Sequence, residues 1–459
     1  MKNEKSKRIL LIITNPFAAT NVIHSGLISL IAQRYHVYIL SDLVREKEIA
    51  DINRRFGIQV ESFSANIPIE NRTLALLRKL EKALFFRHFG IINQIIKEQI
   101  NESIFQYLVK AVLYILDSLN LNRSLLKLLR NLIIRQSSKS SDLRERISAH
   151  QFSGMISTSP LDIRENIVVN SMKQTVRSLA MVISWDNLTT KGLINADYDF
   201  ILVWNQFMAR EYQTFYEPFN IAKQKIAITG IQRFDQYFGT NPNEIDKTKH
   251  RQRFHFDDDD RIILFATSAA KHFPDQIDIV DHLAEYSRDR PRVKIMVRCH
   301  PGDSVDRYQV FEREENIRIE SPEKLVSEGP SIPALNTLLS LYEALKYSDV
   351  CIQVASTMRL DAAACNKPII SIAYDGNKSQ PYSKSVMRFY DYDHQIPLNK
   401  LRIDRMVFSK QELFDALDDT LFCPNVNVPT NRELVKEFTH FSEPHSNTTT
   451  MKFIEEWLN

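Results

Sequence analysis

Glycine is scarce in this chain, and two glycine-dependent nucleotide sites are missing from it. Only 10 of the 459 residues are glycine, and neither G-x-G-x-x-G nor G-x-x-x-x-G-K-[ST] occurs. The first pattern is typical of dinucleotide-binding folds and the second of P-loops, so we expect neither kind of site. Any nucleotide phosphate must therefore be held by side chains and by the ends of helices.

Metal-binding patterns are also missing from the sequence. The four cysteines show no C-x-x-C spacing, and no histidine and cysteine cluster has the spacing of metal ligands. Asp391-Tyr392-Asp393 is formally a D-x-D, but it stands in an irregular stretch and is interpreted as a loop. The sequence therefore predicts no bound metal and no cofactor. The cysteines are expected to be free thiols in a reducing compartment.

Long apolar runs and a strong charge imbalance are absent as well. No apolar run reaches the roughly 18 residues that a membrane-spanning helix needs. The first apolar stretch covers only residues 9–13, which is too short for a signal-peptide core and suits a first strand. The formal net charge of +3 is smaller than the basic excess of dedicated nucleic-acid binders. We therefore predict a cytoplasmic protein that does not bind nucleic acid.

Strands alternate with helices along most of the chain, which predicts an α/β fold with parallel sheets. A β-α-β-α-β pattern covers residues 8–63, resumes at 154–230, and starts again at 261 after a polar stretch. We expect two Rossmann-like domains with right-handed crossovers between their strands. The predicted order is a first domain over 1–237, a linker over 238–250, a second domain over 251–430, and helices over 431–459 that pack back on the first domain.

Residues 71–150 interrupt the first domain and differ from it in character. The part from 71 to 136 is rich in leucine, has a helical pattern, and carries eleven lysines and arginines against four acidic residues. It therefore predicts a helical, basic insertion. Two interpretations stay open: its amphipathic helices touch an anionic membrane surface or a lipid-linked acceptor, or they form a bundle with a solvated basic face.

Polar side chains follow three predicted strands of the second domain, at the points where those strands end. The strands are expected at 261–265, 293–297 and 350–354. Because the carboxyl ends of parallel strands share one edge of a sheet, these side chains should converge there, beside the Asp375 region that follows the next strand. Cationic or neutral donors opposite hydroxyls favour an anion-binding site. The residues concerned are Thr267, Ser268, Arg298, His300, Ser356 and Thr357.

Ser356 and Thr357 stand between the strand at 350–354 and a short, alanine-rich helix at 358–365. Hydroxyls at the start of a helix are one way to hold a phosphate. The alternative is that Ser356 only caps the helix. We favour the phosphate interpretation because His300 is expected at a neighbouring strand end, and a hydroxyl that starts a helix can serve both purposes.

At these residues the sequence resembles the GT-B glycosyltransferases of bacterial surface polysaccharides. His300-Pro301 and Ser356-Thr357 are similar to the HP and SS/ST motifs of bacterial sialyltransferases, Kdo transferases and CDP-glycerol transferases. The run 356–370 also resembles the family pattern of a hydroxyl pair, an acidic residue (here Asp361), a short helix and K-P. Two features depart from these families: the D/E-D/E-G motif of the sialyltransferases is not evident, and V-A-S-T replaces the D-S-G-G of related epimerases.

The resemblance implies a GT-B fold, in which two Rossmann-like domains face a cleft. It implies that His300, Ser356 and Thr357 contact the phosphate of a nucleotide donor, with Asp361 as the acidic residue beside them. It also implies a transfer without a metal, in which positive groups stabilise the leaving phosphate. The two departures leave the donor open and speak against a sugar-nucleotide epimerase.

An inverting transfer needs a base for the acceptor hydroxyl, and the first domain offers two candidates. Asp186, just past the strand at 180–184, is our first choice, and His24 on the first helix is the second. Arg233, after the strand at 226–230, is a candidate to contact the donor from the first domain. The structural alternatives are a turn or N-cap aspartate, a packing or surface histidine, and a surface arginine.

We therefore predict a GT-B glycosyltransferase that transfers a sugar from a CMP-, CDP- or UDP-linked donor. The expected acceptor is a surface glycan, such as capsule or lipopolysaccharide, or a lipid-linked precursor, and contact with the inner face of the membrane follows from one interpretation of the insertion. The alternatives are a glycerol- or ribitol-phosphate transferase of the CDP-glycerol type, and a non-catalytic protein that binds sugar nucleotides or glycans on the same fold.

Overall fold

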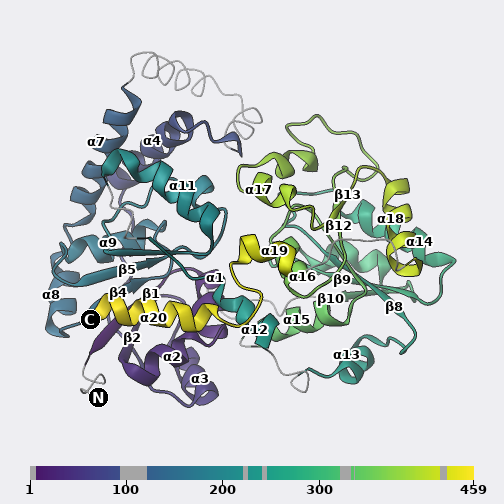
Figure 1. The fold of residues 1–459 in the computed structure, drawn as a ribbon, viewed down its shortest axis with the longest axis horizontal. Helices are drawn as coiled ribbons and strands as arrows, with labels where there is room; N and C mark the ends of the chain where they lie inside the picture. Colours follow the sequence, from purple (N-terminus) through teal and green to yellow (C-terminus); the bar gives the residue numbers. More distant parts are fainter. Residues whose placement is uncertain are drawn as a thin grey trace. The chain divides into compact units, whose positions relative to one another are not determined.

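A computed structural model describes residues 7–93, 121–220, 226–239, 245–320, 332–334, 336–423 and 432–459. The chain divides into two compact units (Figure 1). The first consists of residues 1–235, 327–333 and 445–459, and the second of residues 236–326 and 334–444. Each unit is built on its own parallel sheet, so the predicted α/β class with two such sheets is confirmed.

The described part of the first unit has a seven-stranded sheet in the order β3-β2-β1-β4-β5-β6-β7. All neighbouring strands run parallel. β1 is buried at every residue but the first, which explains why it reads as a continuous apolar run. The strands are β1 (Arg8–Ile13), β2 (His36–Ser41), β3 (Val60–Ser62), β4 (Gly154–Ser157), β5 (Arg177–Met181), β6 (Phe200–Val203) and β7 (Ile226–Ile228).

The first helical segment departs from the prediction of one helix over 22–33. It is broken into α1 (Pro16–Ala19), the π-helix η2 (Thr20–His24) and α2 (Leu27–Arg34). The break falls at Gly26, whose φ of 85° lies in the left-handed region that glycine adopts readily. Apart from the insertion and the C-terminal helix, the other described helices of this unit are α3 (Glu46–Phe56), α9 (Ile163–Ser171), α10 (Asn187–Thr190), α11 (Gln206–Tyr216), η3 (Glu217–Phe219) and η5 (Gln232–Phe234).

The insertion is helical where the structure describes it. It contains α4 (Arg72–His88), α7 (Asn122–Ser137) and α8 (Ser141–Ala149), while residues 94–120 lie outside the described residues. Leu74 of α4 and Ile133 of α7 form one buried cluster with Ile163 and Ile167 of α9, so the two long helices pack on the first unit. Among the described helices, none is long and apolar enough to cross a membrane.

The second unit has, over its described residues, a six-stranded parallel sheet in the order β10-β9-β8-β11-β12-β13. The sequence did not predict β13, a three-residue edge strand with only its last residue buried. Such a strand lacks the apolar run that marks the others. The strands are β8 (Arg261–Ala266), β9 (Val293–Arg298), β10 (Ile317–Glu320), β11 (Val350–Gln353), β12 (Ile369–Ile372) and β13 (Arg405–Val407).

The helices of the second unit pack around a core that includes Ile263, Phe265 and Ile352 of the central strands. The linker expected at 238–250 falls partly on residues 240–244, outside the described residues, and α13 begins within it. The helices are α12 (Asp235–Gly239), which begins on the last residue of the first unit, α13 (Lys247–Phe254), α14 (Ile277–Arg288), η7 (Val305–Phe311), α15 (Thr337–Tyr347), α16 (Met358–Ala364), η8 (Val386–Asp391), α17 (Gln395–Lys400), α18 (Lys410–Phe422) and α19 (Arg432–Thr439).

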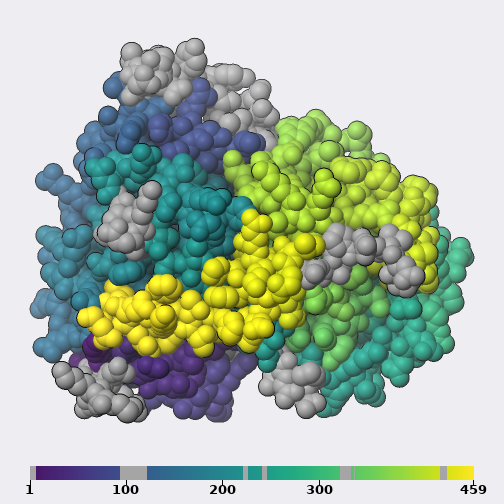
Figure 2. Space-filling view, viewed as in Figure 1, coloured from purple at the N-terminus to yellow at the C-terminus, as the bar shows by residue number. Residues whose placement is uncertain are grey.

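The C-terminal helices belong to different units, whereas we had predicted both on the first. α20 (Ser446–Leu458) packs on the first unit, where Trp457 fills the space above Gly154 of β4. A Cβ at Gly154 would lie only 2.4 Å from the Trp457 ring, so a side chain is excluded there. In Figure 2 this helix lies on the surface beside the purple N-terminal segment.

α19 instead packs in the second unit. Arg432 donates to the carbonyl of Ala364 at 2.9 Å, and its backbone N–H donates to the side chain of Asn366 at 2.7 Å. Its guanidinium also lies 4.8 Å from the ring of Phe238. These contacts fix the start of α19 to the end of α16, which the sequence pattern of α19 alone does not reveal.

Candidate functional site

The second sheet reverses its strand order between β8 and β11, and this is where open α/β sheets bind ligands. β9, β8 and β11 are consecutive in the sheet, with Phe265 of β8 level with Val297 and Ile352. His300 follows β9, Thr267 follows β8 and Ser356 follows β11. The structure therefore brings these predicted residues to the carboxyl ends of three adjacent strands.

His300 is held in one ring orientation by its own loop. Its Nδ1 accepts a hydrogen bond from the backbone N–H of Gly302 at 2.8 Å, so the neutral ring carries its proton on Nε2. Desolvation lowers the pKa of His300; the carboxylate of Asp303 opposes this and the ammonium of Lys271 adds to it. The side chain is thus a neutral hydrogen-bond donor at pH 7. A Cβ on Gly302 would lie 3.2 Å from Nδ1, so glycine leaves room for this contact.

Asp303 is the buried centre of this loop, and the sequence analysis did not assign it a role. Its fully buried carboxylate accepts hydrogen bonds from Thr267 Oγ1 at 2.9 Å, Tyr308 at 2.6 Å and Gln276 at 3.0 Å. Thr267 Oγ1 in turn accepts the backbone N–H of His300 at 2.8 Å. Two hydrogen bonds therefore connect Asp303 through the Thr267 hydroxyl to the backbone of His300 and fix its position. Thr267 thus supports His300.

Ser268, the neighbour of Thr267, is held through its backbone. Its N–H donates to Gln276 Oε1 at 2.7 Å, and its carbonyl accepts from Gln276 Nε2 at 2.9 Å. Its side chain is half-buried. Gln276 thus fixes the loop after β8 through both backbone groups of Ser268.

The loop after β11 has a strained backbone. Ala355 has a φ of 40°, which a residue with a side chain rarely adopts. Two side chains hold it there: Tyr390 accepts the Ala355 N–H at 3.0 Å, and Gln395 donates to the Ala355 carbonyl at 2.7 Å. This turn aims the half-buried hydroxyls of Ser356 and Thr357 to the carboxyl edge. Strain of this kind is typical of functional loops.

A buried polar network extends from Ser356 into the core. The N–H of Ser356 donates to Gln353 Oε1 at 2.7 Å, and Gln353 Nε2 donates to Ser371 at 2.5 Å. Ser371 bonds Asp404, which pairs at 2.7 Å with the fully buried Arg359 of α16. The hydroxyl of Ser356 also accepts the N–H of Met358 at 3.3 Å, which leaves it one lone pair and its own hydrogen. The N-cap residue of α16 is Thr357 and not Ser356, and its side chain makes no capping hydrogen bond.

Two residues predicted to bind the donor are occupied inside the second unit. Arg298 is 8% exposed and forms a buried ion pair with Glu320, with a further hydrogen bond to Ser340 at 3.2 Å. Asp361 is 2% exposed and accepts the hydroxyl hydrogen of Tyr237 at 2.7 Å. Buried charges need such partners, and the sequence motif could not show who they are. We therefore place neither side chain in contact with a ligand.

Asp186 lies beyond the carboxyl end of β5, at the N-cap of α10. Its half-buried carboxylate accepts a hydrogen bond from the Ser184 hydroxyl at 2.5 Å and lies 3.1 Å from the Thr190 hydroxyl, which donates to the backbone carbonyl of Asp186 at 2.8 Å. Lone pairs of the carboxylate therefore stay open. The turn role that we set against a catalytic one is thus real, and it also fixes the orientation of this carboxylate.

The other two candidates of the first unit are buried. His24 is fully buried in η2, and burial lowers the pKa of His24 to about 4, with the charge of Arg55 adding to the effect and a hydrogen bond with the backbone of Pro333 opposing it. Arg233 is 3% exposed and lies over the rings of Phe17 and Phe234, at 5.6 Å and 4.6 Å. The environment of His24 favours its packing alternative. Arg233 is buried, so the alternative of a surface arginine is wrong.

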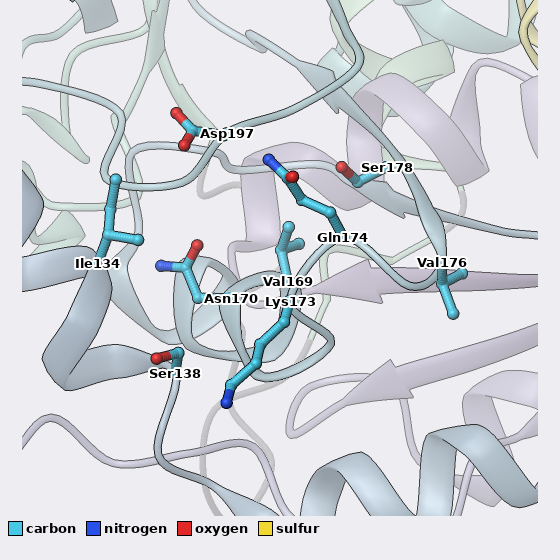
Figure 3. Close-up of a pocket in the computed structure, with 9 residues that line it drawn as sticks. All are labelled: Ile134, Ser138, Val169, Asn170, Lys173, Gln174, Val176, Ser178 and Asp197. Atoms are coloured by element: carbon cyan, nitrogen blue, oxygen red, sulfur yellow. The ribbon is translucent and has the colours of Figure 1, made fainter.

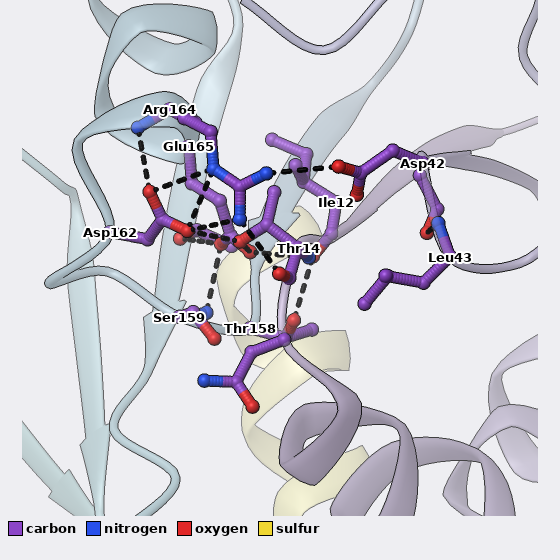
Figure 4. Close-up of polar contacts among 12 residues, drawn as sticks. Ile12, Thr14, Asp42, Leu43, Thr158, Ser159, Asp162, Arg164 and Glu165 are labelled. Carbon is purple, nitrogen blue, oxygen red and sulfur yellow. Dashed lines mark hydrogen bonds and ion pairs between the residues drawn. The ribbon is translucent and has the colours of Figure 1, made fainter. Parts of the chain in front are cut away.

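The first sheet also has a switch point, between β1 and β4, and polar groups fill it (Figure 4). Glu165 of α9 is fully buried there. It accepts hydrogen bonds from the Ser157 hydroxyl at 2.6 Å, the Ser159 N–H at 2.8 Å and the Thr14 N–H at 3.1 Å. One carboxyl group therefore ties the ends of β1 and β4 to the start of α9.

An ion cluster lies next to Glu165. Arg164 bonds Asp162 at 2.8 Å and Asp42 at 2.9 Å, as Figure 4 shows. Burial alone would raise the pKa of Asp162, but the hydrogen bonds from Arg164 outweigh it and the pKa is lowered. Burial raises the pKa of Glu165 to about 7, against the hydrogen bonds that it accepts. The Thr14 hydroxyl lies 2.8 Å from Glu165 and 2.9 Å from Asp162, yet has only one hydrogen to donate. A proton on Glu165 supplies the second hydrogen: Glu165 donates to the Thr14 hydroxyl, and that hydroxyl donates to Asp162.

Glu165→Gln is expected to destabilise the protein by about 1–3 kcal/mol at pH 5, although the two side chains have the same shape. Each carboxyl oxygen of Glu165 accepts one backbone N–H, from Thr14 and from Ser159. Glutamine has one oxygen, so its NH₂ group must face one of these N–H groups and leave it unpaired. The free energy of unfolding, from urea titrations of both proteins, measures the loss.

The stability lost in Glu165→Gln should become smaller as the pH rises. Since the folded-state pKa of Glu165 is raised from 4.5 to about 7, the folded protein binds this proton more tightly than the unfolded chain. Stability from this group is full below pH 4.5 and decreases as the pH rises toward 7. Glutamine does not ionise, so the gap between the two proteins should narrow by pH 8. Equal stability at pH 5, with the exposed Glu145→Gln as reference, would contradict the assigned contacts.

A pocket of about 270 Å³ lies elsewhere in the first unit (Figure 3). It is bordered by the end of α7, the end of α9 and the start of β5, so it lies at the amino end of that strand. It is therefore not at the carboxyl edge where Asp186 lies. Within the described residues, no group of three or more His, Cys, Asp and Glu side chains is placed to hold a metal ion. The pocket residues are Ile134, Ser138, Val169, Asn170, Lys173, Gln174, Val176, Ser178 and Asp197.

The fold is similar to those of solved nucleotide-sugar enzymes. The UDP complex of S. aureus MnaA has a TM-score of 0.54 at 10% identity, covering 99% of this chain and 97% of that one. UDP-GlcNAc 2-epimerase from Neisseria meningitidis, bound to UDP-GlcNAc, has a TM-score of 0.55 at 10% identity, and the match covers 98% of this chain and 99% of that one. A glycosyltransferase from Rickettsia africae has a TM-score of 0.50 at 11% identity, and the match covers 98% of this chain and 97% of that one. At such identities these likenesses show the fold, which is the predicted GT-B type.

The sequence itself matches a known family over more than half of its length. No curated protein matches the chain. The family model of CDP-Glycerol:Poly(glycerophosphate) glycerophosphotransferase matches residues 180–448, a stretch that includes Asp186, His300 and Ser356. This is one of the families whose HP and ST motifs the sequence resembles, so that resemblance is confirmed. The chain belongs to the CDP-glycerol:poly(glycerophosphate) glycerophosphotransferase family of transferases.

Proposed function

We propose that the protein transfers a polyol phosphate, such as glycerol phosphate or ribitol phosphate, from a CDP-activated donor to a hydroxyl of a surface polymer or its lipid-linked precursor. The observation that carries the proposal is the imidazole of His300, locked by the Gly302 N–H so that its Nε2–H is offered at the switch point of the second sheet. The family match supports the choice of a CDP-polyol over a sugar nucleotide. It replaces glycosyl transfer as our first choice.

In the proposed step the acceptor oxygen attacks the phosphorus that bears the polyol. A new P–O bond forms, the bond from that phosphorus to the bridging oxygen breaks, and CMP leaves with the electron pair. His300 Nε2–H and the hydroxyls of Ser356 and Thr357 stabilise the charge that develops on the leaving phosphate. The carboxylate of Asp186 takes the proton of the acceptor hydroxyl. Lys271, an exposed cation close enough to His300 to lower its pKa, adds positive charge nearby. We propose that no metal takes part.

Glycosyl transfer is the second candidate, favoured by the GT-B fold that the chain shares with a glycosyltransferase structure. A donor labelled with ³²P in the polyol-bearing phosphate separates the two. Phosphate transfer moves the label from CDP-glycerol or CDP-ribitol into the polymer and releases CMP. Transfer of a sugar from UDP- or CDP-sugars leaves both phosphates on the released nucleotide. Activity that persists in EDTA supports the metal-free step. Release of CDP or UDP with sugar in the product would overturn the proposal, and nucleotide binding without turnover would indicate a binding protein.

We further propose that α4 and α7 contact an anionic membrane, as one interpretation of the sequence predicted. Both helices expose leucines: Leu80 is 47% exposed and Leu128 is 53% exposed. The only acidic residue on these two helices is Glu81, which is buried. Their exposed faces therefore combine apolar and positive groups, as interfacial helices do. The exposed residues are Arg72, Leu76, Lys79, Leu80 and Arg87 on α4, and Arg123, Lys127, Leu128, Leu132 and Arg135 on α7.

Leu80→Glu together with Leu128→Glu is expected to weaken binding to phosphatidylglycerol vesicles at least about tenfold, because each change removes apolar contact and adds a like charge to the lipid. Co-sedimentation measures it. Leu434→Glu is the matched control, since Leu434 is 44% exposed on α19 of the second unit. Binding that is unchanged in the double variant, or equal on neutral phosphatidylcholine vesicles, would favour the solvated bundle instead.

A further inference from the structure

The loop that follows Asp186 is buried, although it has little regular structure. It comprises residues 189–196, which are the last two residues of α10 and the irregular segment that leads from α10 toward β6. Leu193 is 3% exposed, Ile194 1% and Ala196 3%. A buried loop must pair its backbone N–H and carbonyl groups, and a loop has no sheet or helix to do this. The question is therefore which side chains satisfy this backbone.

Two of these partners come from α4 and the residues just after it. Glu81 accepts the backbone N–H of Leu193 at 3.1 Å, and Asn93 donates to the carbonyl of Thr189 at 3.3 Å. Glu81 is 2% exposed, and burial raises its pKa to about 7, against the hydrogen bonds that it accepts. A buried carboxyl group of this kind lowers stability when it ionises. Glu81 nevertheless pairs a backbone N–H that the loop itself cannot satisfy.

The third partner comes from α7. Arg130 is 4% exposed and donates to the carbonyls of Ile194 at 3.1 Å and Ala196 at 3.0 Å. Its guanidinium also pairs with Asp197 at 2.8 Å, just past the end of the loop. One planar side chain thus holds three acceptors at fixed angles, which lysine cannot reproduce.

The contacts continue to the candidate base. Thr190, at the start of the loop, donates to the carbonyl of Asp186 at 2.8 Å and lies 3.1 Å from its carboxylate. Thr189, whose carbonyl Asn93 holds, donates to the same Asp186 carbonyl at 3.1 Å. The loop is therefore hydrogen-bonded to the backbone of Asp186 and lies close to its carboxylate. It is held from the insertion by Glu81, Asn93 and Arg130, and from outside the insertion by Asn170 and Tyr216.

We infer that Glu81 and Arg130, from the helical insertion, are positioning residues for Asp186. The inference rests on the proposed role of Asp186 as base. The insertion is then part of the reaction machinery of the first unit, in addition to any contact with a membrane. Neither side chain touches a substrate: each acts through the backbone of the loop, and a displacement of about 1 Å at the base is enough to reduce turnover about 100-fold.

The test compares truncating and conservative variants. Arg130→Met and Glu81→Leu are expected to lower kcat at least about tenfold while the dissociation constant for CDP-glycerol stays within twofold, since the donor site is in the second unit. Glu81→Gln keeps an oxygen for the Leu193 N–H and should recover most of the loss; Arg130→Lys keeps the charge but not the fork and should recover little. The matched controls are Lys139→Met and Glu145→Leu, both exposed on the same insertion.

Hydrogen exchange tests the positioning without relying on activity. In Arg130→Met the amides of residues 185–196 should exchange at least about tenfold faster, while those of β8 and β9 keep the rates of the unchanged protein. Faster exchange without loss of kcat would overturn the positioning role of Glu81 and Arg130 but leave the proposed function intact. Exchange and kcat that both stay unchanged would overturn the inference entirely. If the unchanged protein transfers no polyol phosphate but Arg130→Met still shows the exchange effect, the proposed function is refuted. The hydrogen bonds by which Glu81 and Arg130 hold the loop are then still supported.

Discussion

His300→Ala is expected to lower kcat for polyol-phosphate transfer about 100- to 1000-fold, the usual effect of removing one hydrogen-bond donor from a developing oxyanion. The imidazole is offered with its Nε2–H outward because Nδ1 is occupied by the Gly302 N–H at 2.8 Å. Alanine removes the donor and leaves the loop. A transfer assay with CDP-glycerol, at saturating donor and acceptor, measures the loss.

The stability of His300→Ala should change little. Its backbone contact to Thr267 remains, and what disappears is the hydrogen bond to Gly302, a contribution of about 1 kcal/mol. Thermal unfolding is therefore expected to differ by a few degrees at most. His36→Ala is the control, because His36 is exposed at the amino end of β2 in the first unit and is not among the predicted site residues. A His300→Ala protein with normal kcat would remove His300 from the site.

The pH profile gives a second check on His300. Desolvation and Lys271 lower the pKa of His300, against the pull of Asp303, so the ring is neutral at pH 7 and becomes charged only at lower pH. Protonation would place hydrogen on Nδ1, where the Gly302 N–H now donates, and the ring would have to give up that contact. We therefore expect transfer to decrease on the acid side below the ordinary histidine range, and this acid limb should disappear from the residual activity of His300→Ala.

The sequence predicted the strand ends of the second unit well because their chemistry is local. Val293–Arg298 and Val350–Gln353 are mainly apolar, and His300 and Ser356 follow them within two or three residues. In a parallel sheet this is enough to bring His300, Thr267 and Ser356 to one edge, whatever the rest of the chain does. The two sheets and the family resemblance followed from the same local patterns.

The predicted site residues that we no longer place in contact with a ligand have partners that lie far away in the chain. Arg298 is the last residue of β9, two residues before His300, yet its guanidinium is paired with Glu320, the last residue of β10. Asp361 was assigned by a motif, but its partner, Tyr237, lies more than a hundred residues earlier. Burial decides these cases, because a charge that leaves water must find a partner, and sequence patterns do not identify that partner.

Asp303 and Arg130 were missed for two different reasons. Asp303 stands three residues after His300, so a signal was present, but nothing in the run R-C-H-P-G-D shows that its carboxylate is fully buried and accepts several hydrogen bonds. Arg130 was counted among the basic residues of an amphipathic helix. Its side chain instead turns inward to the loop after Asp186, which only the packing of α7 on the first unit determines.

Asp186→Asn is expected to lower kcat by about 100- to 10,000-fold, the range for loss of a general base. Asparagine keeps the size of the side chain and one oxygen for the Ser184 hydroxyl, and Thr190 still has the carbonyl of residue 186 as an acceptor. The loop should therefore keep its conformation, and the dissociation constant for the donor should not change. What is lost is the ability to take a proton from the acceptor hydroxyl.

A purely structural aspartate would give a different result. If Asp186 only ordered its turn, asparagine would lower the melting temperature and leave kcat nearly unchanged, because the amide preserves most of the turn contacts. Asp199→Asn is the control for such an effect, since Asp199 accepts the N–H of Ser178 at 2.7 Å at the opposite end of β5. Loss of kcat in Asp186→Asn but not in Asp199→Asn, with similar unfolding of both, identifies the base. A normal kcat in both variants would show that another residue is the base. The hydrogen bonds of Glu81 and Arg130 would then order the loop for a reason other than catalysis.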